Sequence, residues 1–205
     1  MLQFGFVRSP LFSGIIAGLT ALTLAGCVTT GSSGGSMTSG SSNGCPSISR
    51  VAELSSLTQF INPEKPSDST RVSEVHVTRV TSTCDRKRGT LKLDMTLNFE
   101  GALGPKGRIH AGDKPSFSYP YFIAVTNAQN QILSKEVFAV NFSYDNKSNL
   151  QVQTEDITQM IPLEGTAPAD MRIMVGFQLS NEELTYNRSL PSSELGKSLT
   201  MVIQK

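Results

Sequence analysis

Cysteine and histidine are the residues of this chain with the most specific chemistry, and both are few. The 205 residues include three cysteines, Cys27, Cys45 and Cys84, and two histidines, His76 and His110. A thiol can form a thioether, a disulfide or a metal bond, and an imidazole can ligate a metal or transfer a proton. These residues form no CxxC pair and no zinc-type ligand set. The chemistry of each one must therefore be inferred from the segment around it.

Cys27 ends the stretch Leu24-Ala25-Gly26-Cys27, which directly follows the apolar segment 11–24. Small residues before a cleavage point suit a signal peptidase, and a cysteine just after it matches the lipobox of bacterial lipoproteins. We therefore predict that residues 1–26 are a lipoprotein signal peptide and that Cys27 is the lipidation site, with acyl chains such as palmitate. The alternative is an ordinary signal peptide or membrane helix that happens to end in cysteine. Two or more acyl chains would make a stable bilayer anchor, at about 0.8 kcal/mol per buried methylene.

The segment after Cys27 is rich in serine and glycine, and its composition cannot support a folded core. We predict a flexible linker over 27–44, with a root-mean-square reach of roughly 20–25 Å. A single β-rich domain is expected over 45–205. Of the eighteen basic residues only Arg8 lies before Cys27, which leaves seventeen against seventeen acidic residues. This balance argues against a nucleic-acid partner.

Strand patterns dominate the predicted domain. The clearest is 91–99, where apolar and polar residues alternate. A second pattern begins at Arg71 and ends at Cys84, before the charged turn 85–89. Similar patterns cover 117–126, 132–144, 150–162 and 171–179, with a weaker strand at 199–203. Segment 48–60 fits either a helix or a short strand and turn, and Ser180 with Glu183 predicts a capping box at the start of a short helix. We predict an antiparallel, immunoglobulin-like β-sandwich, with a small β-barrel as the alternative.

Cys45 and Cys84 remain as a pair once Cys27 is lipidated. In an oxidising envelope compartment such pairs form disulfides, and neither a neighbouring histidine nor a CxxC motif favours the alternative of a metal or redox pair. His76 alternates with valines, which predicts a solvent-facing strand residue, and His110 is predicted to be solvated in the loop 101–115. No nucleophile elbow, phosphate loop or metal-ligand spacing is present, so we predict no catalytic residue, no metal and no cofactor.

Two surface features have both a structural and a functional interpretation. The basic triplet 86–88 suits a solvated turn, or contact with phosphate or an acidic partner. Tyr119 and Tyr121 flank Pro120, which cannot donate to a strand ladder. The two tyrosines are therefore either core residues, which we favour, or the anchors of an exposed edge that binds a partner.

Two longer motifs carry a resemblance to a known family. They are YPYFIAVTNAQNQILSKEVF at 119–138 and VGFQLSNEELTYNR at 175–188. With the lipobox, the linker and the two later cysteines, they resemble a family of small envelope lipoproteins of alphaproteobacterial type. The resemblance covers most of 45–188. It implies an envelope location and the extent of the domain, and it supplies no activity or catalytic residue.

These observations predict a lipid-anchored, non-enzymatic envelope lipoprotein that acts as a structural or interaction module, with an unknown envelope protein as partner. Residue 28 is valine and not aspartate, which favours the outer membrane facing the periplasm over the inner membrane. The alternative function is an envelope hydrolase or a small-ligand carrier.

Overall fold

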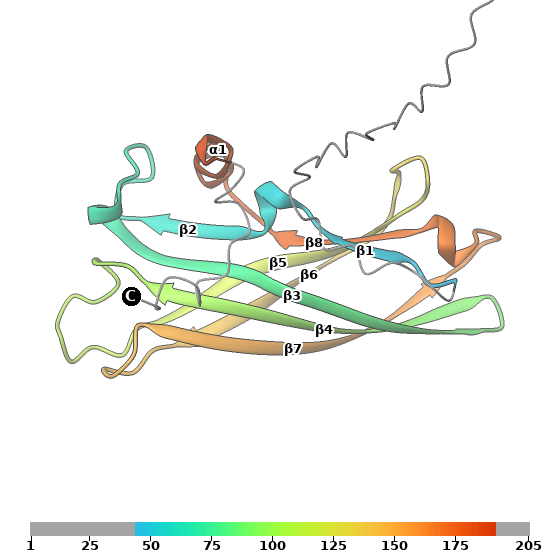
Figure 1. Cartoon of the computed structure of the whole chain (residues 1–205), viewed down its shortest axis with the longest axis horizontal. Helices are drawn as coiled ribbons and strands as arrows, with labels where there is room; N and C mark the ends of the chain where they lie inside the picture. The colour runs from blue at the N-terminus through green and yellow to red at the C-terminus, as the bar shows by residue number, and fades with distance from the viewer. Residues whose placement is uncertain (1–43, 192–205) are drawn as a thin grey trace, which may run out of the picture. The chain divides into compact units, whose positions relative to one another are not determined.

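Two facing sheets form the described part of the chain, and the computed structural model describes residues 44–191. One four-stranded sheet has the order β2 (Ser56–Phe60), β3 (Arg71–Lys87), β4 (Thr90–Leu103), β7 (Leu150–Pro162). The other has the order β1 (Ser47–Arg50), β8 (Arg172–Phe177), β5 (Ser116–Thr126), β6 (Ile132–Ser143). Figure 1 shows the two layers. The predicted β-sandwich is confirmed, and the described strands form two separate sheets and not a closed barrel.

The alternation seen in the sequence places one face of each sheet in a shared core. Along β4, every second residue from Leu91 to Phe99 is buried, and the residues between them are less buried or exposed. On the opposite sheet, β5 and β8 contribute Tyr119, Tyr121, Ile123, Val125, Ile173, Val175 and Phe177. All neighbouring strands are antiparallel except β1 and β8, which run parallel. This pair departs from the antiparallel pattern that the hairpin-length turns predict.

The β3–β4 hairpin is longer than predicted. Cys84 is not the end of the strand, because pairing with β4 continues through Lys87 opposite Thr90. The turn consists of Arg88 and Gly89, with φ values of 47° and 81°. Two consecutive positive φ values are typical of the two-residue turns whose twist matches a hairpin, and glycine adopts them without steric cost.

Segment 48–60 forms a short strand and a turn, one of the two alternatives that the sequence allowed. The turn between β1 and β2 is η1 (Ala52–Leu54), and the described residues include two other short 3₁₀ helices, η2 (Asp68–Thr70) and η3 (Pro168–Asp170). Near the other end of the described chain, α1 (Asn181–Ser189) begins with the predicted capping box. The backbone N–H of Glu183 donates to Ser180 Oγ at 3.2 Å, and the N–H of Ser180 donates to the Glu183 carboxylate at 2.8 Å.

Cys45 and Cys84 form the predicted disulfide, with Cα atoms 5.9 Å apart and 39 residues of sequence separation. The bond joins the start of the domain to β3. Cys27 and the strand predicted over 199–203 lie outside the described residues. Within the described residues, no helix is long and apolar enough to cross a membrane.

Candidate functional site

Tyr119 and Tyr121 are core residues. Both side chains are 0 % exposed, and their rings pack against aromatic neighbours on β6. The Tyr119 ring lies 5.8 Å from Phe142, and the Tyr121 ring lies 5.4 Å from Phe138, centroid to centroid. Burial raises the pKa of both hydroxyls to about 12. The proposal of an exposed partner-binding edge at these two tyrosines is therefore wrong, and the favoured core interpretation holds.

The position of Pro120 explains why β5 tolerates a proline. Tyr121 and Phe177 are the last paired residues of β5 and β8, and the N–H of Gln178 donates to the Pro120 carbonyl at 2.9 Å. In an antiparallel strand the N and O atoms of one residue point to the same side. The missing N–H of Pro120 therefore faces Gln178, just past the end of β8, so the proline removes a hydrogen bond only at the end of this ladder.

The two histidines lie in different surroundings. His76 is 5 % exposed, so the prediction of a solvent-facing side chain is wrong. Alternation places it correctly on the face opposite Val75 and Val77, but that face is not open to solvent at this position. His110 is exposed in the loop after β4, as predicted, with Nδ1 3.6 Å from a carboxylate oxygen of Asp113.

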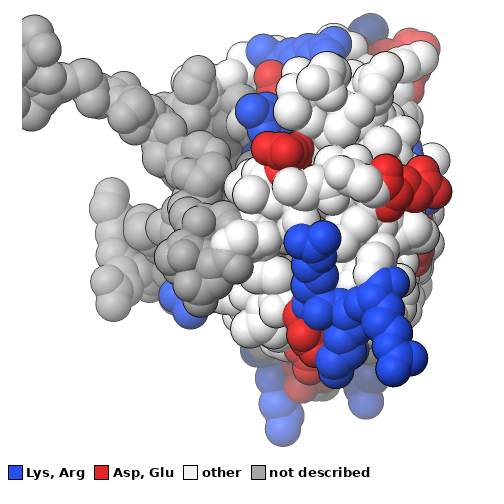
Figure 2. Space-filling model, turned by 90° about the vertical axis from the view of Figure 1, so that its right-hand side faces the viewer, with Lys and Arg blue, Asp and Glu red and all other residues white. Residues whose placement is uncertain are grey.

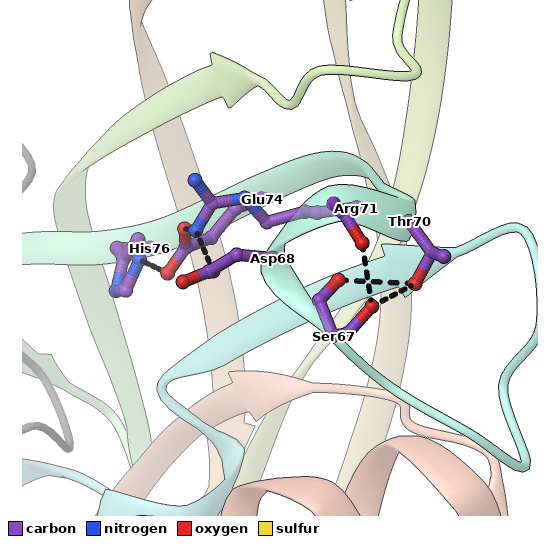
Figure 3. Close-up of polar contacts among 7 residues, drawn as sticks. Ser67, Asp68, Thr70, Arg71, Glu74 and His76 are labelled. Atoms are coloured by element: carbon purple, nitrogen blue, oxygen red, sulfur yellow. Dashed lines mark hydrogen bonds and ion pairs between the residues drawn. The ribbon is translucent and has the colours of Figure 1, made fainter.

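Four ionisable residues form a chain of contacts from η2 into the start of β3 (Figure 3). Arg71 lies between two carboxylates, with Nη1 3.5 Å from Asp68 and 3.1 Å from Glu74. The other Glu74 oxygen lies 2.6 Å from Nε2 of His76. Burial raises the pKa of Glu74, but the hydrogen bond and charge of His76 and the charge of Arg71 outweigh it and lower the pKa below its ordinary value. Glu74 is therefore ionised at neutral pH, and its neighbours stabilise the negative charge.

A surface groove of about 660 Å³ lies between α1, β2 and the loop that follows β2. Figure 1 shows α1 beside β2. Strand β2 supplies Thr58, Gln59 and Phe60 to the groove. The remaining lining residues are Asn62, Pro63 and Glu64 of the loop, Val72 of β3, and Ser180, Glu182, Glu183 and Tyr186 at α1.

Two aromatic rings form the apolar part of this groove. Phe60 and Tyr186 meet with ring centroids 4.8 Å apart and an interplanar angle of 71°, an edge-to-face contact. Such pairs are favourable beyond the area that they bury. The contact fixes α1 against the end of β2, and it leaves both rings only partly buried. The groove therefore has a preformed aromatic surface that solvent and ligands can reach.

The groove is electrostatically negative. Its lining contains three glutamates and neither lysine nor arginine. The pKa of Glu182 is lowered by hydrogen bonds at the start of α1, so this carboxylate stays charged. Burial, then the negative charges of Glu74 and Asp68, raise the pKa of Tyr186, with Arg71 opposing. The carboxylates of Glu74 and Asp68 thus add negative potential at the Tyr186 end of the groove.

No pattern in the sequence indicates this groove. Its walls come from segments near residues 60 and 182, and no motif links the two. The one usable signal was the capping box, which placed a short helix after the last strand but not its packing partner.

Positively charged side chains cluster at one end of the sandwich. Figure 2 views the end that carries the β3–β4 turn, and Lys and Arg side chains cluster there. Arg86, Lys87 and Arg88 are all exposed, and Lys87 lies 3.0 Å from Asp85. Arg86 and Lys87 still pair with β4 and Arg88 begins the two-residue turn, so the basic triplet forms the exposed tip of the β3–β4 hairpin.

Comparisons with known proteins add no relative. No protein-family model matches the chain, and searches of curated proteins and of solved structures find no significant match. Among the described residues, no group of three or more His, Cys, Asp or Glu side chains is placed to hold a metal ion.

Proposed function

We propose that this chain is a lipid-anchored protein of the cell envelope that works as a binding module for another envelope protein. The groove beside α1 carries this proposal, because it combines an accessible aromatic pair with charged carboxylates on a rigid sandwich. Acylated Cys27 and the linker would hold the domain near the membrane and let it reorient. The outer membrane facing the periplasm is the proposed location. The disulfide supports such a compartment, because disulfides persist in oxidising surroundings.

The histidine environment favours binding over catalysis. Glu74 and His76 resemble the acid and base of a catalytic set, but the second ring nitrogen of His76 has no hydrogen-bond partner among the described residues. Covalent catalysis needs a nucleophile within hydrogen-bond reach of the base. His76 is buried and Glu74 is partly buried, and neither residue lines the groove.

Photo-crosslinking in intact envelopes tests the proposed interaction. A photoreactive phenylalanine analogue replaces Thr185 on the exposed side of α1, beside the groove, and the matched control carries it at Asn146, in the turn after β6. A binding module gives one dominant crosslinked protein from the α1 position and none from the control. Equal, diffuse crosslinking from both positions contradicts the proposal. Mass spectrometry of the mature N-terminus tests the anchor, which requires a lipid on Cys27.

A small-ligand carrier is the second candidate, and the groove volume favours it. About 660 Å³ falls within the usual range of small-molecule sites, about 300–1,000 Å³. A carrier would yield a ligand by extraction and mass spectrometry of the purified protein, and it would yield no specific crosslinked protein.

A further inference from the structure

The charge of the groove identifies a class of partner. We propose that it binds an extended peptide segment of a partner protein, with a lysine or arginine side chain laid over Tyr186 and its charge between Glu64 and Glu182. This inference rests on the proposed binding function and specifies its ligand.

Charge complementarity is the first argument. Glu64 and Glu182 are exposed and belong to opposite walls, the loop after β2 and the first turn of α1. The Glu183 carboxylate accepts the backbone N–H of Ser180 and is partly buried, whereas Glu64 and Glu182 are exposed carboxylates that a cationic side chain can reach. Hydrogen bonds between a cationic donor and a carboxylate are among the stronger polar contacts in proteins.

The shape of the groove is the second argument. An adjoining hollow of about 390 Å³ shares Pro63, Glu64, Glu182 and Tyr186 with it and continues along α1 to Ser189. Its lining also lacks lysine and arginine. The shared residues therefore lie in the middle of a longer trough, which suits a chain segment with a side chain in the centre. A cation over an aromatic face gains further electrostatic energy from the ring.

An anionic ligand is disfavoured although α1 begins at this groove. The start of a helix attracts anions through its unpaired N–H groups. Here the N–H of Glu183 donates to Ser180 Oγ, and the carboxylates of Glu182 and Glu183 already lie at this end of the helix. A further anion would meet like charge.

Fluorescence anisotropy with a labelled glycine–lysine repeat peptide tests the inference on the full mature chain. The peptide should bind the wild type. It should bind the double variant Glu64→Gln, Glu182→Gln about tenfold or more weakly, as expected when charged hydrogen bonds are lost. Glu136→Gln removes an exposed carboxylate from β6, away from the groove, and should leave affinity unchanged. Tyr186→Phe keeps the ring and should bind normally, whereas Tyr186→Leu should bind more weakly.

Three results of the same measurement would overturn the inference. These are no binding to the wild type, equal binding of the same peptide with its lysines acetylated, or equal weakening by Glu136→Gln. Spermidine competing as well as the peptide would make the occupant a small polyamine. Tighter binding after Lys197→Gln and Lys205→Gln would make it the chain's own C-terminal segment. A crosslinked partner that persists in the Glu64→Gln, Glu182→Gln variant keeps the binding function but removes this ligand class. Far-ultraviolet circular dichroism confirms that each variant is folded.

Discussion

The side-chain amide of Asn187 donates a 2.8 Å hydrogen bond to the backbone carbonyl of Ser56, across 131 residues of sequence. A second bond of 2.8 Å from the same nitrogen reaches the carbonyl of Glu53. Asn187 is 0 % exposed, so both bonds are shielded from water. One side chain thereby fixes the last turn of α1 to the start of β2, and with it one wall of the groove to the other.

Replacing this amide should destabilise the domain and loosen the groove. Asn187→Ala removes the donor from the buried carbonyl of Ser56 and from the partly buried carbonyl of Glu53, which should lower the free energy of unfolding by about 2–3 kcal/mol. Urea denaturation measures the loss. Thr185→Ala on the exposed face of the same helix is the matched control and should stay within about 0.5 kcal/mol. Equal effects of the two variants would show that Asn187 contributes only helix propensity.

The disulfide should contribute strongly to stability. It closes a loop between two cysteines that are 39 residues apart in the sequence. The chain-entropy model assigns about 4 kcal/mol to a loop of this length. The double variant Cys45→Ser, Cys84→Ser should therefore unfold at clearly lower urea concentration than the oxidised protein. Reducing the wild type with dithiothreitol should reproduce that shift, and failure of reductant to change the midpoint would contradict the prediction.

Two substitutions at Tyr121 should have opposite effects. Tyr121→Ala removes a buried ring and should cost about 3–5 kcal/mol. Tyr121→Phe removes only a hydroxyl that has no hydrogen-bond partner among the described residues. Because a buried unpaired polar group is costly, the phenylalanine variant should be as stable as the wild type or more stable. Thermal unfolding separates the cases, and a large loss with phenylalanine would reveal a hydrogen bond to the hydroxyl.

Alkaline pH should unfold the domain through its buried tyrosines. Folding raises the pKa of Tyr119 and Tyr121 from 10.0 to about 12, and that of Tyr144 is also raised, chiefly by burial. Between these values the unfolded chain releases protons that the folded chain retains, so stability is full below pH 10 and falls as pH rises toward 12. Tyrosinate absorbance should rise together with the loss of circular dichroism. Titration near pH 10 in a chain that stays folded would contradict this.

The strands were predictable because their signal is local. Alternation over 91–99 and the exact span 150–162 depend only on neighbouring residues, and so does the capping box of Ser180 and Glu183. The Cys45–Cys84 bond was predictable by elimination, since Cys27 was assigned to lipid. These features require no knowledge of how distant segments pack.

The error at His76 arises because alternation assigns a side chain to a face but does not say what covers that face. His76 lies on the face opposite Val75, yet it is buried beside Glu74. The charged residues 85–87 have the composition of a turn, yet they pair with β4, so β3 extends beyond Cys84. The groove was not predictable, because Phe60 and Tyr186 meet only in the folded chain.

The disulfide also determines how the domain would respond to a mechanical pull from its N-terminal side. Without it, tension would reach β1 first, an edge strand of four residues. With Cys45 bonded to Cys84, tension passes directly into β3, which is seventeen residues long and hydrogen-bonded to β2 and β4. Unfolding under tension would then require many ladder bonds of one sheet to fail together, whereas the reduced chain would lose β1 by itself at low force.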